Sequence, residues 1–173
     1  LARQNGNSVW MSRLLRPLGL IVCRRGKYAQ AEAYLQEGLD LARQCEDHEQ
    51  ICALLRTLGA VVSKRGDTSQ AIGYWREGLA LARRIGNPDR MCVLLISLGC
   101  AMGEQGDYVR AKEYFQESLA LARQTGYRED IVMTLSNLGW IASEQGNASE
   151  AEEYFQEALS LIRQVANRWL ISS

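Results

Sequence analysis

The residues of this 173-residue chain that could do chemistry are one histidine, five cysteines and twenty acidic side chains. Nucleophilic catalysis needs a base and an orienting group within hydrogen-bond reach of the nucleophile. His48 lies in a predicted turn between helices, where it forms no dyad with any positioned cysteine. No metal-ligand spacing occurs either. The sequence therefore predicts a protein that is not an enzyme and that holds no metal or cofactor.

The acidic residues and the glycines recur instead at a fixed interval. One set of carboxylates repeats every 40 residues: Glu37, Glu77, Glu117 and Glu157. Because these carboxylates occupy the same position in every repeat, they predict a structural or solvated face rather than a catalytic acid and base pair. The glycines also recur one repeat apart, which is typical of helix caps and does not match the spacing of a phosphate-binding loop.

The cysteines form an odd set without a Cys-x-x-Cys pair: Cys23, Cys45, Cys52, Cys92 and Cys100. Free thiols fit a reducing compartment, so we expect a cytoplasmic protein. All five fall in predicted helices or helix ends beside apolar neighbours. This placement favours inert core thiols over redox sensors.

The overall charge excludes two classes of partner. Twenty basic and twenty acidic residues cancel, so no net field favours nucleic acid or an anionic membrane. The longest uncharged stretch runs from Met91 to Gly103 and is too short to span a bilayer as a helix. Any electrostatic preference must therefore be local.

A 40-residue internal repeat is the main signal in the sequence. The shift aligns one Leu-Gly pair per repeat, at Leu18-Gly19, Leu58-Gly59, Leu98-Gly99 and Leu138-Gly139. It also aligns an alanine and a tyrosine in each repeat, at Ala31, Ala71, Ala111 and Ala151, and at Tyr34, Tyr74, Tyr114 and Tyr154. Such self-similarity is the signature of stacked supersecondary units.

Each repeat is predicted to form two helices. In the third repeat, Asn87-Pro88-Asp89 supplies an N-cap, a proline at the first helical position and an acidic first turn. Gly106 ends this helix A as a left-handed cap, and helix B follows from Asp107 to Gly126. The glycine of each Leu-Gly pair is expected to be small because the axes of helices A and B approach closely there.

These positions resemble the tetratricopeptide repeat. The matching residues are Leu55-x2-Leu58-Gly59-x2-Val62 with Ala71-x3-Trp75, and Leu135-x2-Leu138-Gly139-x2-Ala142 with Ala151-x3-Phe155. The repeat departs from the family in its six extra residues, its missing final proline and the aromatic at the third pattern position of helix A, which is replaced by Val62, Met102 or Ala142. The resemblance implies an all-α, right-handed superhelical solenoid of antiparallel helix hairpins. The 40-residue variant also resembles the sensor arrays of bacterial signal-transducing NTPases of the STAND, NB-ARC and MalT type.

The repeat divides the chain into six segments: residues 1–6, the end of a preceding helix B; repeats at 7–46, 47–86, 87–126 and 127–166; and residues 167–173, the start of another helix A. Neither end carries a polar capping repeat, and solenoids need such caps for solubility. Exposed apolar end faces are therefore expected to promote end-to-end self-association. Pro17 is expected to kink the first helix.

By the family's pattern, one face of the A helices lines a concave groove that binds a partner. The candidate residues are Arg13, Arg16, Arg24, Arg56, Lys64, Val93, Ile96, Cys100, Met133, Asn137, Trp140 and Glu144. Basic residues at one end and apolar residues beyond would suit a peptide with acidic and apolar side chains. The alternatives are that Val93, Ile96 and Met133 belong to the core between repeats and that the basic cluster is a solvated face.

Trp140 is the leading single candidate, because Leu20, Ala60 and Cys100 take its place in the other repeats. Only Asn137 resembles a residue of the family's carboxylate clamp for chaperone C-termini, which argues against that ligand. The sequence thus predicts a non-catalytic scaffold that binds a protein or peptide within a larger cytosolic signalling protein. Two alternatives stay open: a self-assembly module that uses its end faces, and a small-ligand sensor arm that controls an attached NTPase.

Overall fold

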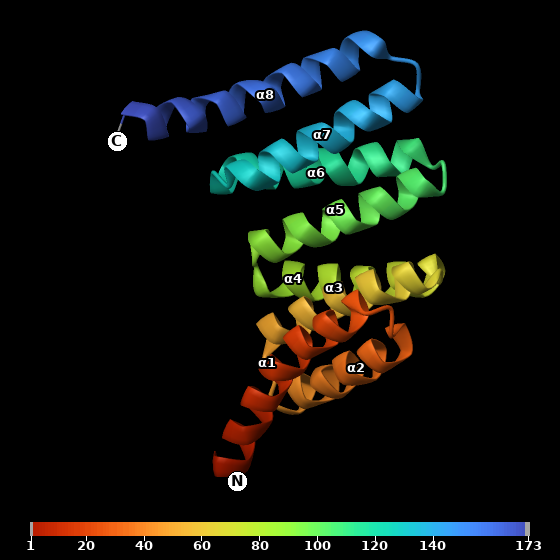
Figure 1. Cartoon of the computed structure of the whole chain (residues 1–173), viewed down its shortest axis with the longest axis vertical. Helices are drawn as coiled ribbons and strands as arrows, with labels where there is room; N and C mark the ends of the chain where they lie inside the picture. The colour runs from red at the N-terminus through yellow and green to blue at the C-terminus, as the bar shows by residue number, and fades with distance from the viewer. Residues whose placement is uncertain (1, 172–173) are drawn as a thin grey trace. The chain divides into compact units, whose positions relative to one another are not determined.

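The computed structural model describes the backbone of residues 2–171 and the side chains of residues 6–164, and every element within this range is an α-helix (Figure 1). The helices are α1 (Ala2–Arg24), α2 (Tyr28–Gln44), α3 (His48–Arg65), α4 (Thr68–Ile85), α5 (Pro88–Glu104), α6 (Tyr108–Thr125), α7 (Arg128–Glu144) and α8 (Ala148–Ile171). Odd-numbered helices are the predicted A helices and even-numbered helices the B helices. The predicted all-α architecture of helix hairpins is confirmed.

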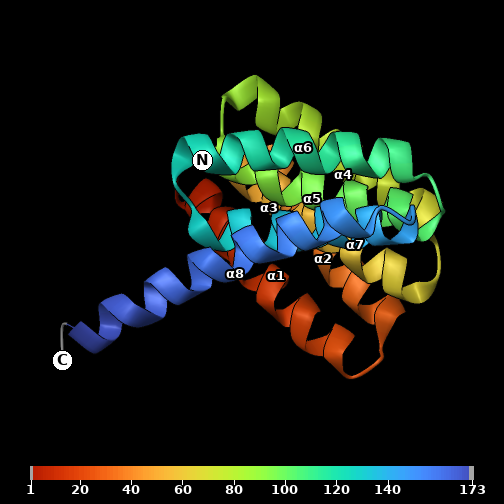
Figure 2. The same cartoon turned by 90° about the horizontal axis from the view of Figure 1, so that it is seen from above.

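The chain divides into two compact units, residues 1–90 and 91–173. In the first unit, α1 pairs with α2 and α3 with α4, and α3 also contacts both α1 and α2. In the second unit, α7 contacts α6 on one side and α8 on the other. The hairpin of α7 and α8 is visible from both directions, and α8 extends past α7 toward the C-terminus (Figure 2).

Polar residues cap the starts of α3, α4, α5 and α6, and left-handed glycines follow the ends of α1 and of α3 to α7. Asp47, Asp67 and Asp107 each accept a hydrogen bond from a backbone N–H three residues on, at 3.0 to 3.2 Å. Asn87 caps α5 in the same way, with 3.1 Å between its Oδ1 and the N of Arg90. Gly106 has a φ of 78°, the left-handed conformation predicted for the residue that ends helix A.

The glycine of each Leu-Gly pair lies against the B helix of its own hairpin. A Cβ on Gly19 would lie 2.8 Å from Cγ of Leu35, and a Cβ on Gly99 would lie 2.5 Å from Cε1 of Phe115. Gly59 faces Trp75 even more closely. No real Cβ tolerates such contacts, so glycine is required for the helices to approach this near. The expected close approach of helices A and B is confirmed.

The repeated carboxylates carry ion pairs between successive B helices. Arg43 contacts Glu77 at 2.7 Å and Arg123 contacts Glu157 at 2.6 Å, and both pairs are separated by 34 residues. These pairs give a structural role to two members of the acidic series, Glu77 and Glu157. They are exposed, so each stabilises the fold by about 1 kcal/mol or less.

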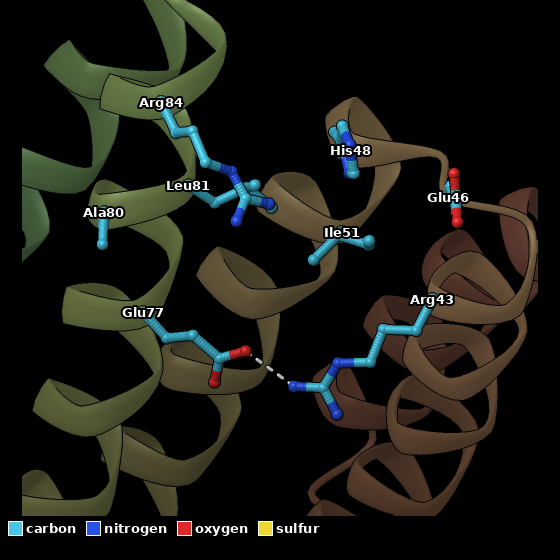
Figure 3. Close-up of a pocket in the computed structure, with 8 residues that line it drawn as sticks. All are labelled: Arg43, Glu46, His48, Ile51, Glu77, Ala80, Leu81 and Arg84. Carbon is cyan, nitrogen blue, oxygen red and sulfur yellow. Dashed lines mark hydrogen bonds and ion pairs between the residues drawn. The ribbon is translucent and has the colours of Figure 1, made fainter.

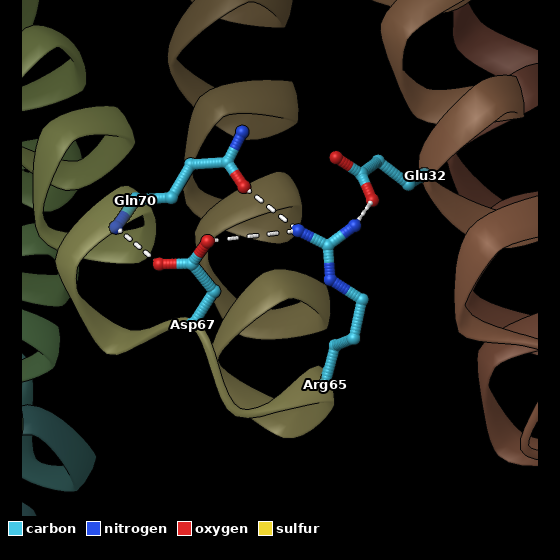
Figure 4. A network of polar contacts seen from close by, with 4 residues as sticks. All are labelled: Glu32, Arg65, Asp67 and Gln70. Carbon is cyan, nitrogen blue, oxygen red and sulfur yellow. Dashed lines mark hydrogen bonds and ion pairs between the residues drawn. The ribbon is translucent and has the colours of Figure 1, made fainter.

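A second network joins the two hairpins of the first unit (Figure 4). The Arg65 guanidinium pairs with Glu32 on α2 and lies 2.9 Å from Oε1 of Gln70 on α4. Asp67 lies 3.8 Å from the same guanidinium and caps α4 through Oδ1. One side chain thereby links three helices at the end of α3.

The structure differs from the predicted segmentation at both ends. Residues 2–6 continue into α1 without a turn, although Gly6 was expected to end a preceding helix. A glycine adopts helical angles as readily as left-handed ones, and Gly6 does not have the positive φ of the glycines that follow the other helices. Residues 166–171 likewise continue α8, because Ala166 replaces the glycine that ends α4 and α6. Pro17 lies inside α1, and the helix continues past it.

Candidate partner-binding surface

Three of the predicted basic residues of the first unit are exposed on its A helices. Arg24 and Lys64 are exposed near the C-terminal ends of α1 and α3. Arg13 is exposed but engaged: its Nη2 lies 3.2 Å from Oδ2 of Asp47, and its guanidinium lies 5.9 Å from the ring centroid of Trp10. Asp47 therefore offsets part of the charge that Arg13 would offer to a partner.

Arg16 and Arg56 differ from these residues because both are half-buried. The Nε of Arg16 is buried and has no hydrogen-bond partner among the described residues. Burial lowers the pKa of Arg56, and the positive charges of Arg16 and Arg90 lower that pKa further. Arg16 and Arg90 therefore both lie within electrostatic reach of Arg56.

The predicted groove residues of α5 are mostly covered. Ile96 is buried, and Val93 and Cys100 are half-buried on α5. Burial and the nearby Glu104 raise the pKa of the Cys100 thiol. For Ile96 the structure therefore matches the alternative of a core residue, and it leaves Val93 and Cys100 partly accessible.

Trp140 stays 38% exposed on α7 and contacts two residues of the preceding repeat. Its ring meets that of Tyr108 edge to face, with 6.3 Å between the centroids and 88° between the planes. A Cβ on Gly103 would lie 2.7 Å from Cζ3 of the indole. The six-membered ring of the indole thus lies against α5, and part of the side chain is open to solvent.

The other predicted residues of α7 surround Trp140 in the sequence. Met133 is 45% exposed, Asn137 is half-buried and Glu144 is exposed. The Tyr108 hydroxyl donates a hydrogen bond to Oε2 of Glu144 over 3.4 Å. The second unit therefore presents an aromatic and thioether surface with one carboxylate at its end.

Tyr108 was missed by reasoning from the sequence. It lies at the start of a B helix, where the repeat pattern predicts no groove residue. Its place in the alignment is taken by Tyr28, Thr68 and Ala148, so a second tyrosine gives no signal of its own. Only correlated substitutions at positions 108 and 140 among related sequences would have indicated this contact.

A depression of about 480 Å³ lies beside the B helices of the first unit, and reasoning from the repeat pattern did not predict it (Figure 3). Arg43, Glu46, His48, Ile51, Glu77, Ala80, Leu81 and Arg84 line it. Glu46, beside this depression, has a left-handed backbone with a φ of 54°. The aligned residues Gly86 and Gly126 are left-handed as well. With two arginines and two glutamates, the depression has no net charge to select an ion.

No disulfide joins the cysteines of the described residues. Cys23, Cys52 and Cys92 are buried, and the Sγ of Cys52 donates to the Gly78 carbonyl over 3.7 Å. Burial raises the pKa of Cys52 from 9.0 to about 11, which keeps the thiol protonated at neutral pH. No group of three or more metal-ligating side chains is placed to hold an ion among the described residues. Within the same residues, no helix is both long and apolar enough to cross a membrane.

Paired helices, a 40-residue repeat and Leu-Gly contacts between helices A and B define the chain as an α-solenoid built from helix hairpins. The family model of the tetratricopeptide repeat matches residues 10–84, 52–124 and 89–164. The chain belongs to the tetratricopeptide repeat family. No curated protein sequence matches it.

Solved structures share the fold at low sequence identity. Aspartyl phosphate phosphatase F from Bacillus subtilis is 12% identical with a TM-score of 0.85, over 91% of this chain and 42% of that protein. A STAND protein with a tetratricopeptide repeat sensor from Pyrococcus horikoshii is 17% identical, with a TM-score of 0.81 over 93% and 25%. A Rap protein complexed with competence and sporulation factor is 15% identical, with a TM-score of 0.80 over 88% and 43%. The chain thus spans less than half the length of each of these proteins.

Proposed function

We propose that this chain is a non-catalytic scaffold that binds another protein or a peptide through exposed side chains of its A helices. It acts as the sensor or interaction segment of a larger cytoplasmic signalling protein. The likeness to a Rap protein complexed with competence and sporulation factor and to a STAND protein with a repeat sensor supports this proposal. Both likenesses concern the fold, so the surface residues carry the argument for this chain.

The exposure of Trp140 and Met133 on α7 is the observation that carries the proposal. Leu138 and Ile141 on the same helix are buried, as are Leu58 and Leu98, which align with Leu138. At the variable positions, two large apolar side chains stay open to solvent. Tryptophan and methionine are both enriched in protein interfaces. These two residues would bind apolar anchors of the partner.

Affinity capture from a cytosolic lysate tests the proposal with matched variants. Trp140→Ala with Met133→Ala removes the exposed apolar surface of α7. Val109→Ala is the control, because Val109 is 66% exposed on the B helix α6. The proposal predicts a partner that is retained by wild type and by the control and lost by the double variant, with equal helicity in all three. Retention by the double variant would contradict it.

A second candidate function is self-assembly through end faces, and one observation favours it. Leu14 on α1 is 66% exposed, whereas Leu54 and Leu94, which align with it, are fully buried. On α8, Phe155 and Leu159 are exposed, whereas the aligned Phe115 and Leu119 are buried. A second copy could cover the α1 face with its own α8 face. Analytical ultracentrifugation tests this candidate, which predicts a sedimentation coefficient that rises with protein concentration. Leu14→Lys should abolish this rise, whereas Val109→Lys should leave it unchanged. A monomer at all concentrations would reject self-assembly.

A further inference from the structure

We propose that copies of this chain associate head to tail, with α8 of one copy packed against α1 and α2 of the next and held in register by two intermolecular ion pairs. One pair joins Glu152 to Arg25 of the second copy, and the other joins Arg163 to Glu37 of the second copy. The inference deepens the self-assembly candidate, on which it rests for the contact between the α1 and α8 faces.

The apolar face of α1 has the pattern of a face that a B helix covers. Three exposed side chains follow one another along it at helical spacing: Leu14, Leu18 and Ile21. The aligned side chains of α3 are all buried: Leu54, Leu58 and Val61. On α3 the covering helix is α2, because Cδ2 of Leu54 lies 3.2 Å from the position of a Cβ on Gly38. A B helix is therefore the occupant that fits the α1 face.

The apolar face of α8 has the opposite requirement. Three of its side chains are 41% to 50% exposed: Phe155, Leu159 and Ile162. The aligned side chains of α6 are buried: Phe115, Leu119 and Ala122. The helix that packs on α6 is the A helix α7, where Oγ1 of Thr134 lies 3.3 Å from Oγ of Ser118. A second copy satisfies both faces in one contact because α1 is an A helix and α8 is a B helix, whereas two α1 faces or two α8 faces would not.

Contacts within the chain also define the register of this association. Gly38 lies beside Leu54 on the next A helix, and Ser118 lies beside Thr134 at the same spacing of 16 residues. When the 40-residue repeat is continued from the fourth repeat into the first repeat of a second copy, this spacing places Leu14 of the second copy beside Ala158. The contact would cover a leucine that is 66% exposed in the single chain.

Charges at the junction complement one another in this register. Within the first unit, Arg65 pairs with Glu32 of the preceding B helix (Figure 4). Glu152 aligns with Glu32, and Arg25 aligns with Arg65, so the junction brings together the same two charges. The repeat does not require them, because the intervening positions hold other combinations: Ile72 with Gln105, and Lys112 with Gln145. The complementary charges are therefore a feature of this junction and not of the repeat pattern.

The second ion pair extends a series along the B helices. Two pairs of this series have the same spacing of 34 residues: Arg43 with Glu77, and Arg123 with Glu157. On α8 the position of the arginine is held by Arg163, and on α2 the position of the glutamate is held by Glu37. Head-to-tail association gives each of these two residues the partner that the series predicts.

The four side chains of the two proposed pairs are available for these contacts. All four are exposed: Arg25, Glu37, Glu152 and Arg163. None of them forms an ion pair with another residue that the structure describes. Glu152 accepts a hydrogen bond from Nε2 of Gln156 over 2.8 Å through Oε1, so its second carboxylate oxygen can accept from Arg25.

The proposed contact is heterologous, because it joins two different faces of the chain. A dimer held in this way keeps one free α1 face and one free α8 face. Association should therefore continue beyond a dimer as the protein concentration rises.

Sedimentation equilibrium of the whole chain at low ionic strength tests the register with two charge-swapped variants. The first carries Glu152→Arg and Arg163→Glu, and the second carries Arg25→Glu and Glu37→Arg. Each variant keeps the net charge of wild type. Alone, each should self-associate about tenfold more weakly than wild type, because two attractions become two repulsions. An equimolar mixture should regain the wild-type association constant within about twofold, because contacts between unlike variants again join opposite charges.

The control variant carries Glu153→Arg and Arg76→Glu, which reverse two exposed charges outside the proposed contact. Glu153 aligns with Gly73, where no neighbour lies within 4 Å of a Cβ. The control should associate within about twofold of wild type.

Loss in both variants, recovery in their mixture and masses beyond a dimer together support the register. A variant that associates like wild type, a mixture as weak as its components, or a mass that stops at the dimer would overturn it. If wild type associates and the swaps have no effect, the register alone fails and the self-assembly candidate stands. A wild-type chain that is monomeric at all concentrations would overturn both.

Discussion

The indole of Trp140 occupies the space that Gly103 leaves on the preceding A helix, since a Cβ at Gly103 would lie 2.7 Å from Cζ3 of the ring. The aligned positions of Gly103 hold Cys23, Ser63 and Ser143, so this glycine and this tryptophan are both departures from the repeat. The contact explains how a large residue fits between two A helices and still exposes 38% of its surface.

Gly103→Ala should displace the indole and destabilise the fold by about 1 kcal/mol, because a new methyl group overpacks the contact but the partly exposed ring can move. Denaturant unfolding and the NMR signal of the Trp140 indole N–H measure the two effects. In a Trp140→Ala background the same glycine substitution should cost almost nothing. An equal cost in both backgrounds would show that the glycine serves another purpose.

Gly99→Ala should destabilise the hairpin more strongly, by about 1 to 3 kcal/mol, because Phe115 is fully buried and cannot move away. Gly73→Ala on α4 is the control, since nothing lies within 4 Å of a Cβ there. That control should stabilise its helix by about 0.5 to 1 kcal/mol through alanine's higher helix propensity. Urea unfolding of the three proteins gives the comparison, and similar effects of the two substitutions would contradict the packing account.

Phe115 and Phe155 align in the repeat but differ in burial, at 0% and 41% exposed. Phe115→Ala should cost about 3 to 5 kcal/mol, the usual range for a buried aromatic residue. Phe155→Ala should cost less than half as much, because part of the ring already contacts water. Thermal unfolding followed by circular dichroism measures both changes. Equal costs would mean that the α8 face is covered in solution, as the self-assembly candidate requires.

Arg56→Ile should stabilise the fold by about 1 kcal/mol, because it replaces a half-buried cation without a counterion by the residue that α5 has at the same position. Chemical denaturation measures the change in the free energy of unfolding. A variant less stable than wild type would show that Arg56 serves the fold.

Alkaline pH should destabilise the chain partly through Cys52. Its folded pKa is about 11 against an ordinary value of 9.0, so the unfolded state loses its proton first as pH rises. The stabilising contribution is complete below pH 9.0 and is lost as pH rises through about 11. Cys52→Val, which introduces the residue found at the aligned Val132, should flatten the decline in this range. A decline of unchanged slope in the variant would exclude Cys52 as a cause.

Much of the fold could be predicted from the sequence because it follows from local rules repeated four times. Asn87, Pro88 and Gly106 mark the bounds of α5 through cap chemistry that acts within a few residues. The ends could not be predicted in the same way. At Gly6 and Ala166 the repeat register indicated a boundary, but no cap or neighbouring helix forces one, and the helices continue.

The candidate surface was predictable by position but not by environment. The family pattern selected Arg16 and Ile96 alike, although Ile96 is buried and Arg16 lacks a partner for its Nε. Sequence spacing places a side chain on a face of a helix, whereas its exposure depends on what the neighbouring helix presents there. Tyr108 shows the converse, because it reaches Trp140 from a helix that the pattern assigns to the other face.

Site-specific photo-crosslinking tests the central claim, binding through the A helices, most directly. A photoreactive phenylalanine derivative would replace Met133 on α7 in one protein and Val109 on α6 in another, since both positions are exposed. Binding through the A helices predicts a discrete crosslinked partner from position 133 and none from position 109. The claim would be contradicted if position 109 crosslinked to the same partner. It would also be contradicted if affinity capture retained a partner that neither position crosslinked.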